Sequence, residues 1–179
     1  MRLERGEVRL CRVPEGTAGE TYLVVPVPEA DAAVRIISGP DALPAHVTVL
    51  GPFAPVSALT DEVDKVIREV AAAIIPWSAR FQEVRAFDDG TLWLAPLDSR
   101  PFRALITELS GRFPEHPPYG GRFALSEVIP HLTLEEGSAL SPSDAAAALG
   151  ESLPLTSRIE TLEFWLIHPD GIEVVSRWP

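Results

Sequence analysis

Two short segments of the chain share one pattern: a histidine, an apolar residue, a threonine and a second apolar residue. They are HVTV at 46–49 and HLTL at 131–134. The chain has four histidines and nine threonines, so random placement predicts less than one His-x-Thr. On a β-strand, residues i and i+2 point to the same face. The pattern therefore predicts two strands, each with an apolar face for the core and a polar face that meets water, a ligand or the other strand.

The segments around these strands predict an α+β chain with a repeated order of elements. Thr60 can cap a helix over 61–74, and Ser141 can begin another that Gly150 ends. Each motif strand is expected between two helices and before a hairpin, which suggests an internal duplication. The other predicted helices are 31–38 and 100–113, and the predicted strands are 21–27, 45–50, 80–87, 91–95, 122–128, 130–135, 160–167 and 172–178.

Composition narrows the class of protein. With 179 residues, 46% of them hydrophobic and 23% charged, the chain is expected to form a single domain, 1–179, made of two duplicated lobes. Its net charge of −11 argues against tight binding of long nucleic acid, which needs clustered Lys and Arg. A locally positive pocket for a small anion remains compatible with that charge.

The same sequence predicts a cytoplasmic protein that is not embedded in a membrane. Cys11 is its single cysteine, so an internal disulfide and a cysteine-based zinc site are excluded. The N-terminal residues MRLERGEVRL contain no apolar signal core, and no apolar run is long enough to span a bilayer.

Paired histidines and threonines suit the cleavage of a phosphodiester. If the two halves pack about a pseudo-twofold axis, His46, Thr48, His131 and Thr133 meet around one small volume. An imidazole has an ordinary pKa near 6.5, so one histidine can accept a proton while the other donates one. The threonine hydroxyls can donate hydrogen bonds to the phosphate oxygens. This scheme needs neither a metal nor a cofactor.

Three segments resemble the two-histidine (2H) phosphoesterase superfamily, including its 2′-5′ RNA ligase-like and cyclic phosphodiesterase branches. They are PAHVTVLGPF at 44–53, TLWLAP at 91–96 and PHLTLEEG at 130–137. The resemblance implies a bilobal fold with two antiparallel sheets facing a central cleft and with helices outside. It also implies metal-independent chemistry on 2′,3′-cyclic phosphates or 2′-5′ phosphodiesters, and it assigns the catalytic roles to His46, Thr48, His131 and Thr133. It does not separate hydrolysis from ligation.

Further residues are candidates for substrate contacts. Tyr119 and, with less support, Phe53 could stack on a base, and Arg122 could neutralise phosphate. We assign His131 as the base and His46 as the acid, acting on a small nucleotide or an RNA end. The remaining histidines, His116 and His168, fit a solvated loop and a turn.

Three alternatives stay open at this point. The chain could be a non-catalytic nucleotide-binding module, an enzyme that joins RNA ends, or a zinc hydrolase, although zinc usually takes three or more protein ligands. Trp93 and Trp165 fall on strand patterns and are expected in the core rather than as base platforms.

Overall fold

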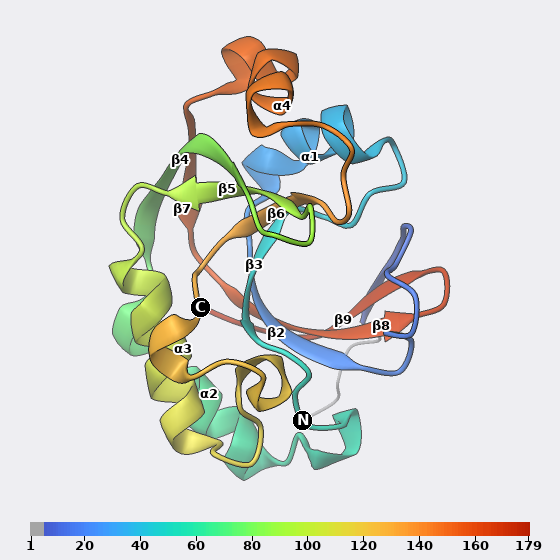
Figure 1. Cartoon of the computed structure of the whole chain (residues 1–179). Coiled ribbons are helices and arrows are strands. Elements are labelled where there is room, and N and C mark those ends of the chain that lie inside the picture. Colours follow the sequence, from blue (N-terminus) through green and yellow to red (C-terminus); the bar gives the residue numbers. More distant parts are fainter. Residues whose placement is uncertain (1–5) are drawn as a thin grey trace.

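A computed structural model describes residues 6–179, which form four α-helices and nine antiparallel strands (Figure 1). The helices are α1 (Asp31–Ser38), α2 (Asp61–Ile74), α3 (Arg100–Arg112) and α4 (Pro142–Leu149). The strands are β1 (Glu7–Leu10), β2 (Thr21–Pro26), β3 (His46–Leu50), β4 (Trp77–Ala86), β5 (Leu92–Pro96), β6 (Leu132–Glu135), β7 (Leu155–Ile159), β8 (Leu162–His168) and β9 (Gly171–Trp178).

All nine strands belong to one sheet, in the order β1-β9-β8-β2-β3-β6-β5-β4-β7. The expected division into two separate sheets is therefore wrong. The middle residues of the two motifs, Val47 and Leu132, lie opposite each other and pair β3 with β6. This pairing joins the two halves and removes the open strand edge that each half would otherwise expose. The expected twofold relation between the halves stays a prediction.

The helices cover the sheet in two pairs (Figure 1). Helices α2 and α3 pack together, with α3 against β3 and α2 against β9. Helices α1 and α4 form the second pair, with α1 against β6 and α4 against β4. Thr60 and Ser141 cap α2 and α4 as predicted, because each side chain accepts a hydrogen bond from a backbone N–H of the first turn.

Strand β2 is buried on both of its faces. Leu23 and Val25 lie in the main core, whereas Val24 points to the other face and packs in a smaller apolar cluster with Trp165. This explains why the TYLVVPV segment is almost continuously apolar instead of alternating. The face opposite the main core is therefore apolar around β2 and β8, beside the motif strands.

Most predicted elements are confirmed, but residues 122–128 do not form the expected strand. A short 3-10 helix spans Leu125–Glu127, and only Val128 of this segment is buried. The reason is local: the backbone at Gly120 and Gly121 has positive φ, and the Glu127 carboxylate accepts a hydrogen bond from the Ala124 N–H. Strands β1 and β7 were not predicted from the sequence.

The expectation drawn from the first ten residues falls partly on residues 1–5, outside the described range. Within residues 6–179, no helix combines the length and apolar character needed to cross a bilayer.

Candidate active site

The two motifs lie side by side at the centre of the sheet. Val47 and Leu132 are fully buried in the main core. The histidine and threonine of each motif are partly exposed, and alternation places them on the opposite face of the sheet. We call this the motif face; it carries His46, Thr48, His131 and Thr133. The structure thus brings together the four residues that the sequence predicts as catalytic.

Both imidazoles are held in the same way. His46 Nδ1 lies 2.8 Å from the carbonyl oxygen of Pro44, and His131 Nδ1 lies 2.7 Å from that of Ile129. A carbonyl only accepts hydrogen bonds, so Nδ1 carries the proton in each neutral ring. Nε2 of each ring therefore holds the free lone pair, and it has no hydrogen-bond partner among residues 6–179. Each Nε2 can accept a proton or, once protonated, donate one.

Burial biases both histidines toward the neutral form. Burial lowers the pKa of His46 below 6.5, and repulsion from His131 lowers it further, whereas the Pro44 carbonyl, Glu163 and Asp31 oppose the change. Burial also lowers the pKa of His131, with Ile129 and Asp89 acting in the opposite direction.

Aromatic side chains pack against each histidine on the motif face. The ring of Trp165 lies 4.7 Å from that of His46, between ring centroids. His131 contacts Phe87 edge-on at 4.9 Å and Trp93 at 5.8 Å. Trp93 and Trp165 are almost fully buried, as the sequence predicts, and each also packs against one of the two imidazoles.

The predicted substrate-contact residues differ in position. Tyr119 is half-buried, and its N–H donates to the Gly51 carbonyl at 2.8 Å, which places its loop beside the end of β3. Burial raises the pKa of Tyr119 to about 12. Arg122 is exposed and forms no ion pair with residues 6–179. Phe53 is only 7% exposed and packs in the main core against Phe113, so the structure does not bring it to the motif face.

The other two histidines lie away from the pair. His116 packs against the ring of Phe53, and His168 Nε2 lies 3.0 Å from the Glu173 carboxylate. In residues 6–179, no three His, Cys, Asp or Glu side chains are grouped as metal ligands.

Two features of the motif face were missed from the sequence. Phe87 follows β4, and its contact with His131 depends on the β4–β5 hairpin. Glu163 is buried in β8 at 2% exposure, where it pairs with Arg177. A charged residue inside the apolar run TLEFWLI was the signal that could have identified it.

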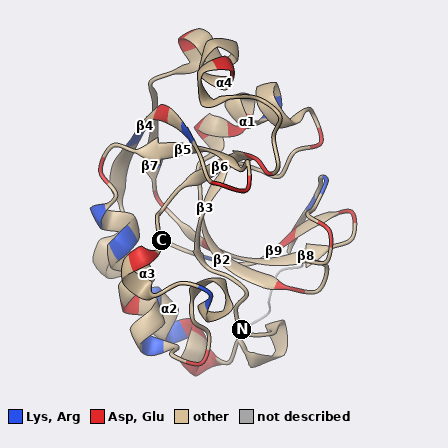
Figure 2. Cartoon of the chain, in the orientation of Figure 1, with Lys and Arg blue, Asp and Glu red and all other residues tan. Residues whose placement is uncertain are grey.

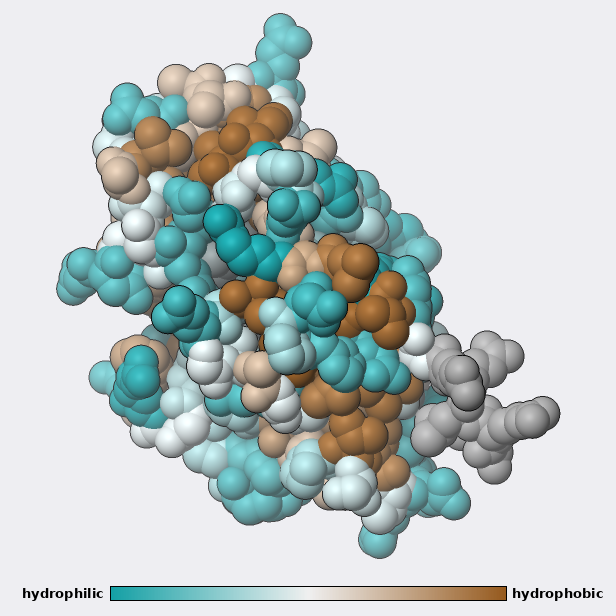
Figure 3. Space-filling model, turned by 90° about the vertical axis from the view of Figure 1, so that its right-hand side faces the viewer, coloured by the Kyte–Doolittle hydropathy of each residue, from teal (hydrophilic) through white to brown (hydrophobic). Residues whose placement is uncertain are grey.

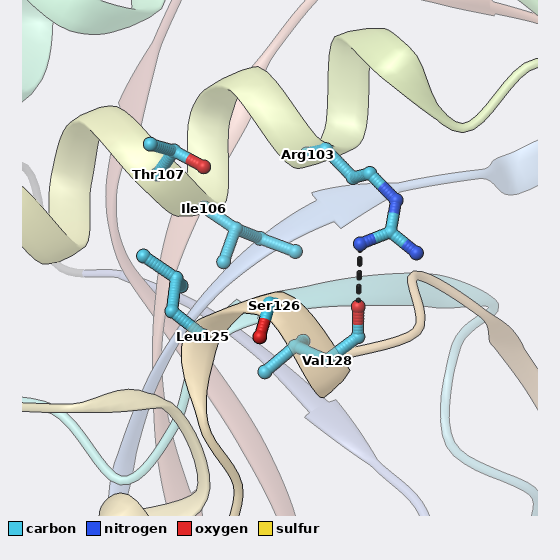
Figure 4. A pocket seen from close by; sticks show the side chains of 6 residues that line it. All are labelled: Arg103, Ile106, Thr107, Leu125, Ser126 and Val128. Atoms are coloured by element: carbon cyan, nitrogen blue, oxygen red, sulfur yellow. Dashed lines mark hydrogen bonds between the residues drawn. The ribbon is translucent and has the colours of Figure 1, made fainter.

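One hollow of the described surface lies away from the motif face. It has a volume of about 390 Å³ and lies between α3 and the 125–128 segment; no histidine lines it, and Arg103 there donates to the Val128 carbonyl (Figure 4). Apolar surface is divided into separate patches on the side shown in Figure 3. Acidic and basic segments are interspersed on α2 and α3 (Figure 2).

The fold of this chain is similar to that of a solved protein of low sequence identity. TT0787 of Thermus thermophilus is 17% identical, with a TM-score of 0.55 over 89% of this chain and 96% of that one. Usb1 of Kluyveromyces marxianus is 15% identical, with a TM-score of 0.42 over 89% of this chain and 99% of that one. No curated protein matches the chain. The model of the 2′-5′ RNA ligase superfamily matches residues 36–171, which include both motifs, and the chain therefore belongs to this superfamily of 2H phosphoesterases.

Proposed function

We propose that the protein is a metal-independent phosphoesterase that hydrolyses 2′,3′-cyclic phosphates or 2′-5′ phosphodiesters of nucleotides or short RNA. One observation carries the proposal. Two histidines on one face donate through Nδ1 to the carbonyl two residues earlier, and each leaves Nε2 free. A histidine with a structural role needs no second histidine with the same hydrogen bond. Acid–base catalysis needs two such rings, one to accept a proton and one to donate one.

The proposed step moves two protons. His131 Nε2 accepts a proton from water as the water oxygen bonds to phosphorus. The bond from phosphorus to one ribose oxygen breaks, and His46 Nε2 donates its proton to that oxygen. The hydroxyls of Thr48 and Thr133 donate to the two non-bridging oxygens, whose bonding strengthens in the transition state.

A small substrate fits the charge of the chain. A net charge of −11 opposes a long phosphate backbone, so we expect a nucleotide or an RNA end as substrate, no cofactor, and a cytoplasmic location. Tyr119, next to the end of β3, would stack on the base, and the exposed Arg122 would neutralise the phosphate.

The first test is hydrolysis of the four nucleoside 2′,3′-cyclic monophosphates in excess EDTA. The intact protein should turn over at least one of them, and His46→Ala and His131→Ala should each lose about 10²–10⁴-fold in kcat. His168→Ala is the matched control because it removes a histidine that pairs with Glu173 instead. Equal activity of all four proteins would refute the two-histidine mechanism, and inhibition by EDTA would favour a metal hydrolase.

A second substrate separates the base from the acid. Bis(p-nitrophenyl) phosphate has a leaving group that departs without protonation, so loss of the general acid should matter little. With it, His46→Ala should keep most of the wild-type rate and His131→Ala should not. The reverse pattern would exchange the two roles.

The superfamily name favours one second candidate, the joining of RNA ends. It predicts a 2′-5′-linked product from one RNA with a 2′,3′-cyclic phosphate and another with a 5′-hydroxyl. Binding of these RNAs without hydrolysis or joining would instead indicate a non-catalytic nucleotide-binding module.

A further inference from the structure

A buried carboxylate lies behind His46 on the motif face. Glu163 is 2% exposed, and both of its oxygens are used. Trp165 Nε1 donates to Oε2 at 2.7 Å, and Arg177 Nε donates to Oε1 at 2.7 Å. The carboxylate is therefore fixed from two sides, by its own strand and by β9.

This carboxylate is connected to the catalytic ring through one side chain. The indole that donates to Glu163 is the ring that lies 4.7 Å from His46. Strand register supports the connection, because Val24 lies opposite both Thr48 and Glu163. Glu163 is therefore two strands from the motif strand, about 10 Å at ordinary strand spacing, on the same face.

Stability alone gives little reason for this arrangement. Removing a carboxylate and a guanidinium from water is costly, and apolar residues of similar size often stabilise such a site as well or better. The buried cluster that contains Trp165 is apolar: Cys11, Val24, Trp165, Ile167, Ile172 and Val174. A buried charge bonded to this cluster, and connected through Trp165 to His46, points to a role in the reaction.

We propose that Glu163 is a positioning residue for His46: its carboxylate holds the Trp165 indole against the imidazole and keeps a negative charge on the same face of the sheet. The catalytic part rests on the proposed function; the interaction between Glu163 and His46 does not.

Several other charges also act on His46. Burial lowers its pKa most, and His131 from β6 lowers it too, whereas Glu163 from β8 and Asp31 from α1 raise it. Arg177 from β9 partly neutralises Glu163. Arg9 from β1 interacts with both Glu163 and Asp31. Removal of the Glu163 charge alone should therefore lower the pKa of His46.

The experiment is an NMR titration of the histidine Cε1–Hε1 signals in the whole protein, comparing wild type with Glu163→Gln. His46 should titrate at lower pH in the variant than in the wild type. Glu173→Gln is the matched control, because it removes a carboxylate from the adjacent strand β9 that pairs with His168. A His46 midpoint that does not move in Glu163→Gln, or that moves equally in Glu173→Gln, would overturn the proposal.

Kinetics test the positioning role separately. Trp165→Phe keeps the charge and an aromatic ring but removes the indole donor. Removal of a general acid lowers kcat by roughly 10²-fold or more. We expect Trp165→Phe to lower kcat by a smaller factor and to leave KM nearly unchanged. A wild-type kcat in Trp165→Phe would refute the positioning role. This result decides the matter even if Glu163→Gln does not fold. Absence of hydrolysis by the wild-type protein, with the NMR shift present, would reject the proposed function but keep the interaction.

Discussion

The pair Val47–Leu132 joins the two halves of the sheet. Truncation of Leu132 tests how much packing at this pair contributes to the free energy of unfolding. Leu132 is fully buried and lies opposite Val47 in β3 and Leu94 in β5. Leu132→Ala removes buried methyl groups and leaves a cavity, which should cost about 2–5 kcal/mol of unfolding free energy. A loss of about 3 kcal/mol in a chain of this length lowers Tm by roughly 6–12 °C.

The assay is urea unfolding followed by tryptophan fluorescence, with a thermal melt as a second measure. Leu140→Ala is the control, because Leu140 is 43% exposed in a loop and its truncation should change stability by no more than about 0.5 kcal/mol. At a temperature where Leu132→Ala is folded, its kcat should also fall, because Leu132 directly follows His131 and anchors it in β6. A loss below about 1 kcal/mol would refute the idea that this joint is tightly packed.

Four more predictions concern the two motif histidines, two glycines and Arg122. The pKa values of His46 and His131 are lower in the folded state than in the unfolded state. The unfolded state therefore binds protons first, so their contribution makes stability fall as the pH drops below about 6.5. Urea unfolding between about pH 7.5 and 5.5 should show a smaller loss when both are replaced by Asn. Gly111→Ala should stabilise α3 by about 0.5–1 kcal/mol in a thermal melt, because an added Cβ meets no atom within 4 Å. Gly171→Ala, whose Cβ would lie 2.2 Å from the Arg9 carbonyl oxygen, should instead lower Tm. Arg122→Gln should change stability by no more than about 0.5 kcal/mol, since the side chain is exposed, and should raise KM for a cyclic phosphate.

The sequence pattern correctly predicted elements whose caps and apolar spacing lie within the element itself. Helix α2 begins after Thr60 and ends at Ile74 as expected, because its cap and its apolar spacing are both local signals. The prediction of a strand at 122–128 was wrong because the composition of the segment fits a strand. In the structure, the positive φ of Gly120 and Gly121 and the hydrogen bond from Arg103 of α3 to the Val128 carbonyl hold it as a loop. Among the described strands, β7 pairs only with β4, which is far away in sequence. Local sequence pattern did not predict this strand.

By itself, the sequence determined the two motif strands, the polar face of each and the identity of the paired histidines. Alternation on a strand is a property of the backbone, and His-x-Thr needs only neighbouring residues to specify it. Only the tertiary structure decided that β3 and β6 pair within one sheet, that Phe53 lies in the core, and that the buried Glu163 is bonded to the tryptophan that packs against His46. These depend on contacts between strands distant in the chain, where packing and register select the partner.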